Sequence, residues 1–168
     1  MVGRIRFAVA VGLIFLPALS LSQNLAQRED SWSRYRNARF GTSVDVPGIF
    51  TIVEPASANG DGRTYRSADG AELRVFGSHG AATVTENFAA YRTWLLDQLR
   101  TDGVVVTYTA KGKEWLVASG TRDGDIVYVK VIQGCGATHE IRVTYPIASR
   151  QVYDSLIGRL ARSLGCLP

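Results

Sequence analysis

Three consecutive β-strands between Lys113 and Pro146 constrain the fold more than any other stretch of the sequence. The segment reads KEWLVASGTRDGDIVYVKVIQGCGATHEIRVTYP. It is rich in β-branched and aromatic residues, and its last strand alternates apolar with polar side chains, as half-buried strands do. Asp123-Gly124 tolerates the positive φ of a hairpin turn, and the glycines around Cys135 mark a second turn. We expect an antiparallel meander on which the rest of the chain packs. Because both faces of its first strand are largely apolar, we place that strand centrally, covered on each side.

Two helices are predicted, one before and one after the meander. The segment from Thr83 to Glu86 matches a capping box, and apolar residues then recur at spacings of three and four until Gly103. Ser149 can cap a second helix with similar spacing, which Gly165 ends. The first apolar face comprises Val84, Phe88, Tyr91, Leu95 and Leu99, and the second comprises Val152, Leu156, Leu160 and Leu164.

Short alternating runs predict the remaining strands, with an edge strand starting near Trp32. They span residues 40–46, 49–54, 64–67, 71–77 and 104–110. The fold class predicted is α+β: an antiparallel sheet of six to eight strands in one layer, flanked by two helices as an α/β/α sandwich. The chain has 168 residues, 46% apolar and 20% charged, which suits a single domain over 32–168.

The first 22 residues have the pattern of a secretory signal peptide. Arg4 and Arg6 precede the apolar run FAVAVGLIFLPAL, and small residues follow between positions 18 and 22. The run is shorter than the roughly 20 residues that a membrane-spanning helix needs. A lipid anchor is not expected, because no cysteine stands at the cleavage region. We therefore expect a periplasmic or extracellular protein with no membrane span in its mature form and a flexible segment over 23–31.

Export determines how the two cysteines, Cys135 and Cys166, are interpreted. An even number of thiols in an oxidising compartment favours a disulfide, and two cysteines allow only one pairing. This bond would join the last turn of the meander to the end of the second helix. Two buried free thiols and a redox pair are the alternatives, although the CxxC spacing typical of a redox pair is absent.

The order of these elements resembles the PsbP-like superfamily of small α/β/α sandwich proteins. The segments that carry the resemblance are FGTSVDVPG, NGDGRTYRS, DGAELRVFG, KGKEWLVASG, IVYVKV, IRVTYP and YDSLIGRLARSLG. The resemblance covers nearly the whole chain after the signal peptide. It implies a mostly non-enzymatic role, since known members include a photosystem II subunit, a Ran-binding transport factor and exported bacterial proteins. The sequence differs from the lipidated bacterial members in lacking a lipobox cysteine. It also shows no plastid transit peptide and no photosynthetic context, so neither the photosystem II role nor the Ran-binding role is carried over.

Two polar, glycine-bearing turns are the candidate interaction surface. The first is NGDGR, with Asn59, Asp61 and Arg63; the second is AKGK, with Lys111 and Lys113. Loops that combine glycine with polar and basic residues often host recognition, and we expect these two to face each other across the meander.

An aromatic groove is the alternative binding site. Tyr65, Trp115, Tyr128 and Tyr145 could line it with Arg63, Arg66 and Lys113 at its rim, although cross-strand core pairs explain the same aromatics.

No arrangement of residues predicts a catalytic, cofactor or metal site. His79 and His139 lack a third ligand in their neighbourhood, so we interpret both as surface turn residues and the Ser78-His79 pair as part of a flexible linker. The NGDG segment has Gly70 where a calcium loop needs a bidentate acid. FGSHG is not the GxSxG motif of hydrolases, which makes a hydrolase the weakest hypothesis.

These observations exclude one class of partner and predict two. The formal charge of +4 comes without a basic run of the kind that binds nucleic acid, so no nucleic-acid partner is expected. The function predicted first is an exported, non-enzymatic accessory domain that binds another protein of the cell envelope. The alternative is a small-molecule or metal-binding carrier that uses the aromatic sheet face.

Overall fold

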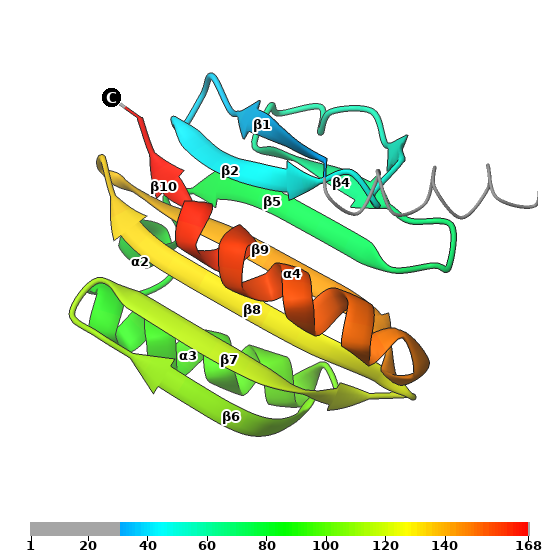
Figure 1. Cartoon of the computed structure of the whole chain (residues 1–168). Helices are drawn as coiled ribbons and strands as arrows, with labels where there is room; N and C mark the ends of the chain where they lie inside the picture. The colour runs from blue at the N-terminus through cyan, green and yellow to red at the C-terminus, as the bar shows by residue number, and fades with distance from the viewer. Residues whose placement is uncertain (1–30, 168) are drawn as a thin grey trace, which may run out of the picture.

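The computed structural model describes residues 31–167. The predicted signal peptide and almost all of the predicted flexible segment lie outside these residues. The described chain forms two antiparallel sheets and two long helices (Figure 1). The strands are β1 (Trp32–Arg36), β2 (Thr42–Pro47), β3 (Ile52–Val53), β4 (Gly62–Arg66), β5 (Glu72–Ser78), β6 (Val105–Lys111), β7 (Trp115–Arg122), β8 (Asp125–Gly134), β9 (Ala137–Pro146) and β10 (Gly165–Cys166). The helices are α2 (Gly80–Thr83), α3 (Phe88–Thr101), the 3₁₀ turn η1 (Ile147–Ser149) and α4 (Arg150–Ser163).

The meander is confirmed as β7, β8 and β9 and supplies three of the seven strands of the main sheet. Seven strands run in the order β3-β4-β5-β9-β8-β7-β6, so β8 and β9 lie near the middle and β7 is next to the edge. The central position predicted for β7 is therefore wrong, since β9 pairs with β5 and only β6 lies outside β7. Asp123 and Gly124 both have positive φ in the β7–β8 turn, as this sequence pair favours.

The predicted α/β/α sandwich is confirmed, but its strands do not form one layer. β1, β2 and β10 form a separate three-stranded sheet. This sheet lies with α4 over one face of the main sheet, while α3 covers the other face (Figure 1). One core packs β2 and α4 against β5 and β9, and the second packs α3 against β7 and β8.

Two helix boundaries differ from the predicted ones, and one predicted capping bond is absent. Thr83 ends the short helix α2, and α3 begins after Asn87, whose side chain accepts a hydrogen bond from the Ala90 N–H at 3.0 Å. The capping box was the wrong start because Asn87, four residues later, is a stronger N-cap than Thr83, and Val84 is consequently exposed. Ser149 precedes α4 but makes no capping bond, because its hydroxyl donates to Asp69 instead. Gly165 lies in β10 rather than ending the helix, since α4 stops at Ser163.

The disulfide between Cys135 and Cys166 is present and joins the two sheets. Cys135 lies in the β8–β9 turn of the main sheet and Cys166 in β10 of the small sheet. Next to it, Leu167 donates its N–H to the Gly41 carbonyl at 2.8 Å. Gly41 has a φ of +69° and touches the Leu167 backbone so closely that a β-carbon would lie 2.1 Å from the Leu167 carbonyl oxygen. The C-terminal end of the described chain is thereby held against the β1–β2 loop.

Candidate interaction surface

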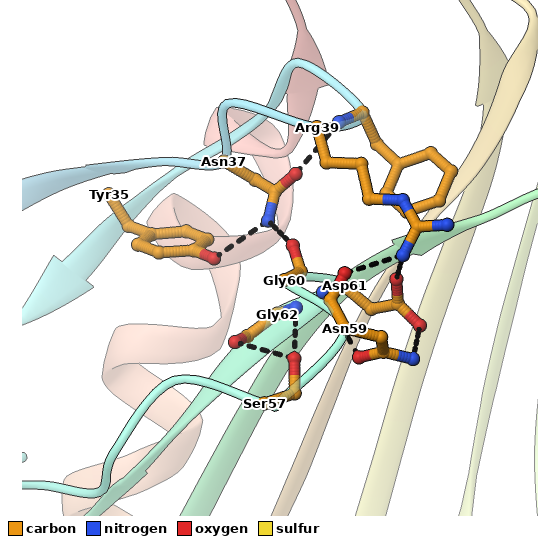
Figure 2. A network of polar contacts seen from close by, with 9 residues as sticks. Tyr35, Asn37, Arg39, Ser57, Asn59, Gly60, Asp61 and Gly62 are labelled. Carbon is orange, nitrogen blue, oxygen red and sulfur yellow. Dashed lines mark hydrogen bonds and ion pairs between the residues drawn. The ribbon is translucent and has the colours of Figure 1, made fainter.

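Two loops from different sheets are joined by side-chain hydrogen bonds at one end of the sandwich. We call them the loop cluster, defined as residues 37–41 between β1 and β2 and residues 57–62, which run from the β3–β4 loop to the first residue of β4. Asn37 connects them, because its amide nitrogen donates to the Gly60 carbonyl at 2.7 Å and to the Tyr35 hydroxyl at 3.3 Å (Figure 2). Its amide oxygen accepts the Phe40 N–H at 2.8 Å. Asn37 is almost fully buried, and all three of these bonds are at least partly shielded from water.

Arg39 makes the second connection between the loops. Its guanidinium donates to the Asp61 carboxylate at 2.8 Å and to the Asn59 carbonyl (Figure 2). The Asn59 side chain in turn donates to the other Asp61 oxygen. Half of the Arg39 side chain remains exposed, and its guanidinium carbon lies 5.0 Å from the Phe40 ring centre. The cation is thus held in one orientation while part of it faces solvent, which suits recognition of an acidic or carbonyl group.

Shallow hollows adjoin this ion pair on several sides. One is lined by Ser57, Asn59, Asp61 and Arg63, and another by Arg36, Arg39, Phe40, His79 and Cys135. The Phe40 and His79 rings meet edge to face with 5.2 Å between their centres. The surface therefore offers aromatic rings and fixed polar groups together, a combination typical of protein interfaces.

The structure brings together only three of the five residues predicted for the interaction surface. Asn59, Asp61 and Arg63 lie in or beside the loop cluster. Lys111 and Lys113 lie at the β6–β7 turn, on the opposite edge of the main sheet. Gly62 and Lys111 occupy one transverse row of the sheet, but β5, β9, β8 and β7 separate their strands. Strands are spaced about 4.8 Å apart, so the two turns are more than roughly 20 Å from each other and do not face each other as predicted.

The four predicted groove aromatics also separate. Tyr65 and Tyr145 are buried in the core beneath α4 and the small sheet, as the cross-strand explanation requires. Trp115 and Tyr128 do line an open groove beside α4, together with Lys130 and Ile132. The Lys130 ammonium donates to the Ala161 carbonyl at 2.6 Å, and burial lowers the pKa of this amine.

The two histidines have different environments. His79 is exposed, and its Nδ1 lies 3.3 Å from the Gly136 carbonyl. The surface assignment is wrong for His139, which is fully buried in β9 and contacts the Thr42 hydroxyl at 2.7 Å and the Gly134 carbonyl at 3.0 Å. Ser78 is likewise the last residue of β5, with its hydroxyl 2.9 Å from that of Thr138, rather than part of a flexible linker.

A buried ion pair lies on the face of β9 that α3 covers. Arg142 donates to the Glu140 carboxylate at 3.2 and 3.3 Å, and the Glu140 side chain is nearly inaccessible to solvent. Burial raises the pKa of Glu140, while Arg142 opposes the shift. Burial also raises the pKa of the nearby Tyr91 hydroxyl to about 12. Among residues 31–167 no three His, Cys, Asp or Glu side chains are grouped so that they could hold a metal ion.

Asn37, Arg39 and Phe40 were not predicted as part of the surface. The available signal was weak: Asn37 has the pattern of an ordinary turn residue, and nothing in the local sequence indicates a contact with residues more than twenty positions away.

Within residues 31–167 no helix has the length and apolar character needed to cross a membrane.

Comparison with solved structures identifies the architecture. The solution structure of the cyanobacterial PsbP protein CyanoP from Synechocystis sp. PCC 6803 superposes with a TM-score of 0.58 over 82% of this chain and 93% of that chain, at 14% identity. The chain has a PsbP-like fold. The resemblance predicted from the sequence is thus confirmed at the level of the fold, which is as far as 14% identity reaches. A Pseudomonas aeruginosa protein of unknown function, described as a putative regulator, has a TM-score of 0.46 at 14% identity over 82% of this chain and 98% of its own. No family model matches the sequence, and no curated protein matches it either.

Proposed function

We propose that this protein is an exported, non-catalytic accessory domain that binds another protein of the cell envelope through the loop cluster. The observation that carries the proposal is the fixed geometry of Arg39, which Asp61 and the Asn59 carbonyl hold in place while half of its side chain stays exposed. A surface ordered before binding loses little conformational entropy in the complex.

Export is supported by the signal-peptide pattern of residues 1–22 and by the disulfide, which is typical of oxidising compartments. An accessory role is supported by the PsbP-like fold, by analogy with the family's largely non-enzymatic members.

The proposal is tested by partner capture with matched arginine variants. The tagged full-length protein is expressed in an exporting bacterium, cross-linked in the cell and purified, and its partners are identified by mass spectrometry. We expect Arg39→Ala to lose the partner, whereas Arg100→Ala keeps it. Arg100 is a suitable control because it forms an exposed ion pair with Asp97 at the same 2.8 Å distance on α3, far from the loop cluster. Equal partner recovery from both variants would refute recognition through Arg39.

A small-molecule carrier is the second candidate, favoured by the groove beside α4. Trp115, Tyr128 and Ile132 give this groove apolar walls, Lys130 adds a cation, and its volume is about 410 Å³. Ligands of the folded state raise the melting temperature, so a thermal-shift screen with a metabolite and metal panel tests this candidate. A hit must be lost in Trp115→Ala to count for the groove.

A further inference from the structure

β6 is an open edge of the seven-stranded sheet and differs from the other open edges. It has seven residues, VVTYTAK, and no strand pairs with its outer side (Figure 1). The opposite edge strand, β3, has two residues, as has β10 at one edge of the small sheet. β1 carries two arginines among its five residues. Edges are commonly protected by shortness or by charge, and β6 has neither before Lys111.

The outward backbone groups of β6 follow from its pairing with β7. The Gly112 N–H donates to the Trp115 carbonyl at 3.0 Å, so this is a hydrogen-bonded pair. Hydrogen-bonded and non-hydrogen-bonded pairs alternate along an antiparallel ladder. The pairs Lys111 with Leu116 and Thr109 with Ala118 are therefore of the second kind. Thr109 and Lys111 thus turn their N–H and C=O groups toward the open edge, where another strand could bind them.

Apolar side chains flank this edge on one face of the sheet. Val105 is 66% exposed, Tyr108 56% and Trp115 38%, and the register of β6 with β7 puts all three on the face that also bears α4. A bulge at Thr107 interrupts the ladder. The regular part of the edge therefore runs from Tyr108 to Lys111 and ends at the basic β6–β7 turn.

The positive charge of the β6–β7 turn determines which residue a strand paired with β6 would carry at this end. Lys111 and Lys113 are both exposed, and among the described residues neither forms an ion pair. Arg92 reaches the turn from α3 and donates to the Gly112 carbonyl, whereas Glu114 is the acidic residue of the turn. Three cations against one carboxylate favour an acidic group at this end of the edge.

We propose that β6 accepts an extended segment of a partner protein as an eighth, antiparallel strand. The segment has apolar side chains at alternating positions, which pack on Tyr108 and Trp115, and an acidic residue at its N-terminal end beside Lys111 and Lys113. Backbone hydrogen bonds to Thr109 and Lys111 supply affinity, while the alternating side chains and the charge supply specificity. This surface is separate from the loop cluster, so Arg39→Ala leaves it intact and either proposal can fail alone.

The test measures amide hydrogen exchange of the folded protein with two synthetic probes. One is acetyl-Asp-Glu-Val-Thr-Val-Thr-Val-amide and the other is its acetyl-Lys-Lys-Val-Thr-Val-Thr-Val-amide counterpart. We expect the acidic probe to protect the Thr109 and Lys111 amides and to bind about tenfold more tightly than the lysine probe. Lys111→Glu/Lys113→Glu should reverse this preference. Thr109→Pro should abolish binding of both probes, because proline removes an outward N–H that the ladder with β7 does not use.

Three results would overturn the proposal. The first is an absence of protection at Thr109 and Lys111 with either probe. The second is equal affinity for the two probes, which would remove the role of the lysines. The third is protection that rises with protein concentration without any probe, since the edge would then be occupied by a second copy of the chain. If Thr109→Pro does not fold, the charge-reversal variant still decides between these outcomes.

Discussion

Replacing Thr42 with valine should destabilise the protein only while His139 is present. The Gly134 carbonyl accepts a hydrogen bond from His139 Nε2 at 3.0 Å, so Nε2 carries the proton and Nδ1 accepts from the Thr42 hydroxyl at 2.7 Å. Both residues are fully buried. Thr42→Val keeps the side-chain shape but leaves Nδ1 without a donor, at a cost of about 1–3 kcal/mol.

A double-mutant cycle isolates this interaction. In His139→Leu no acceptor remains, so we expect Thr42→Val to be nearly neutral there and the coupling free energy to be about 1–3 kcal/mol. Urea unfolding at pH 7.5 gives the free energy of unfolding of all four proteins. In thermal unfolding, Thr42→Val alone should lower the melting temperature by roughly 3–8 °C. A coupling free energy under about 0.5 kcal/mol would refute the assigned hydrogen bond.

The same histidine predicts a dependence of stability on pH. Burial lowers the pKa of His139 below its ordinary value of 6.5, although the bond to the Gly134 carbonyl opposes the shift. The unfolded chain therefore binds the proton first, and stability that is present above pH 6.5 falls as the pH drops through the folded-state pKa. His139→Leu should lack this loss.

Three further predictions concern other parts of the fold. Burial raises the pKa of Glu140, so the native protein should lose stability as the pH rises above 4.5, and Glu140→Gln should flatten that slope in pH-dependent urea unfolding. Hydrogen bonds from Ser67 and Tyr153 outweigh burial and lower the pKa of Asp69 to about 2. This carboxylate therefore stabilises the native protein above pH 3.8 by about 1 kcal/mol, a value reduced for its exposure, and the stabilisation is lost as the pH falls toward 2. Asp69→Asn should lack both the stabilisation and its dependence on pH. Reduction of the disulfide should lower the free energy of unfolding by about 3–4 kcal/mol, measured by chemical unfolding with and without reductant. For each of the three predictions, unchanged unfolding curves would contradict it.

The sequence predicts the elements of this fold better than their arrangement. The meander was predictable because alternation, β-branched residues and the Asp123-Gly124 turn are local signals that agree with one another. The apolar faces of α3 and α4 were predictable for the same reason, and Leu95 and Leu160 are buried as expected. The start of α3 was not, because Thr83 and Asn87 are competing caps and tertiary packing decides between them.

The candidate site required information that no local pattern holds. The loops at Asn59 and Lys111 look alike in composition, but strand order puts them at opposite edges of the sheet. Arg39 reaches Asp61 across the two sheets, because its loop joins β1 and β2 of the small sheet while Asp61 precedes β4 of the main sheet. His139 was wrongly predicted to lie at the surface. It is buried because it contacts Thr42 of β2, which lies 97 positions away in the sequence.

The most direct test of the account is the affinity of the captured partner for three forms of the full-length protein: wild type, Arg39→Ala and Arg100→Ala. If the loop cluster is the recognition surface, the dissociation constant rises about tenfold or more in Arg39→Ala and stays within about twofold in Arg100→Ala, with both variants folded by circular dichroism. A partner that binds Arg39→Ala as tightly as wild type would contradict the account.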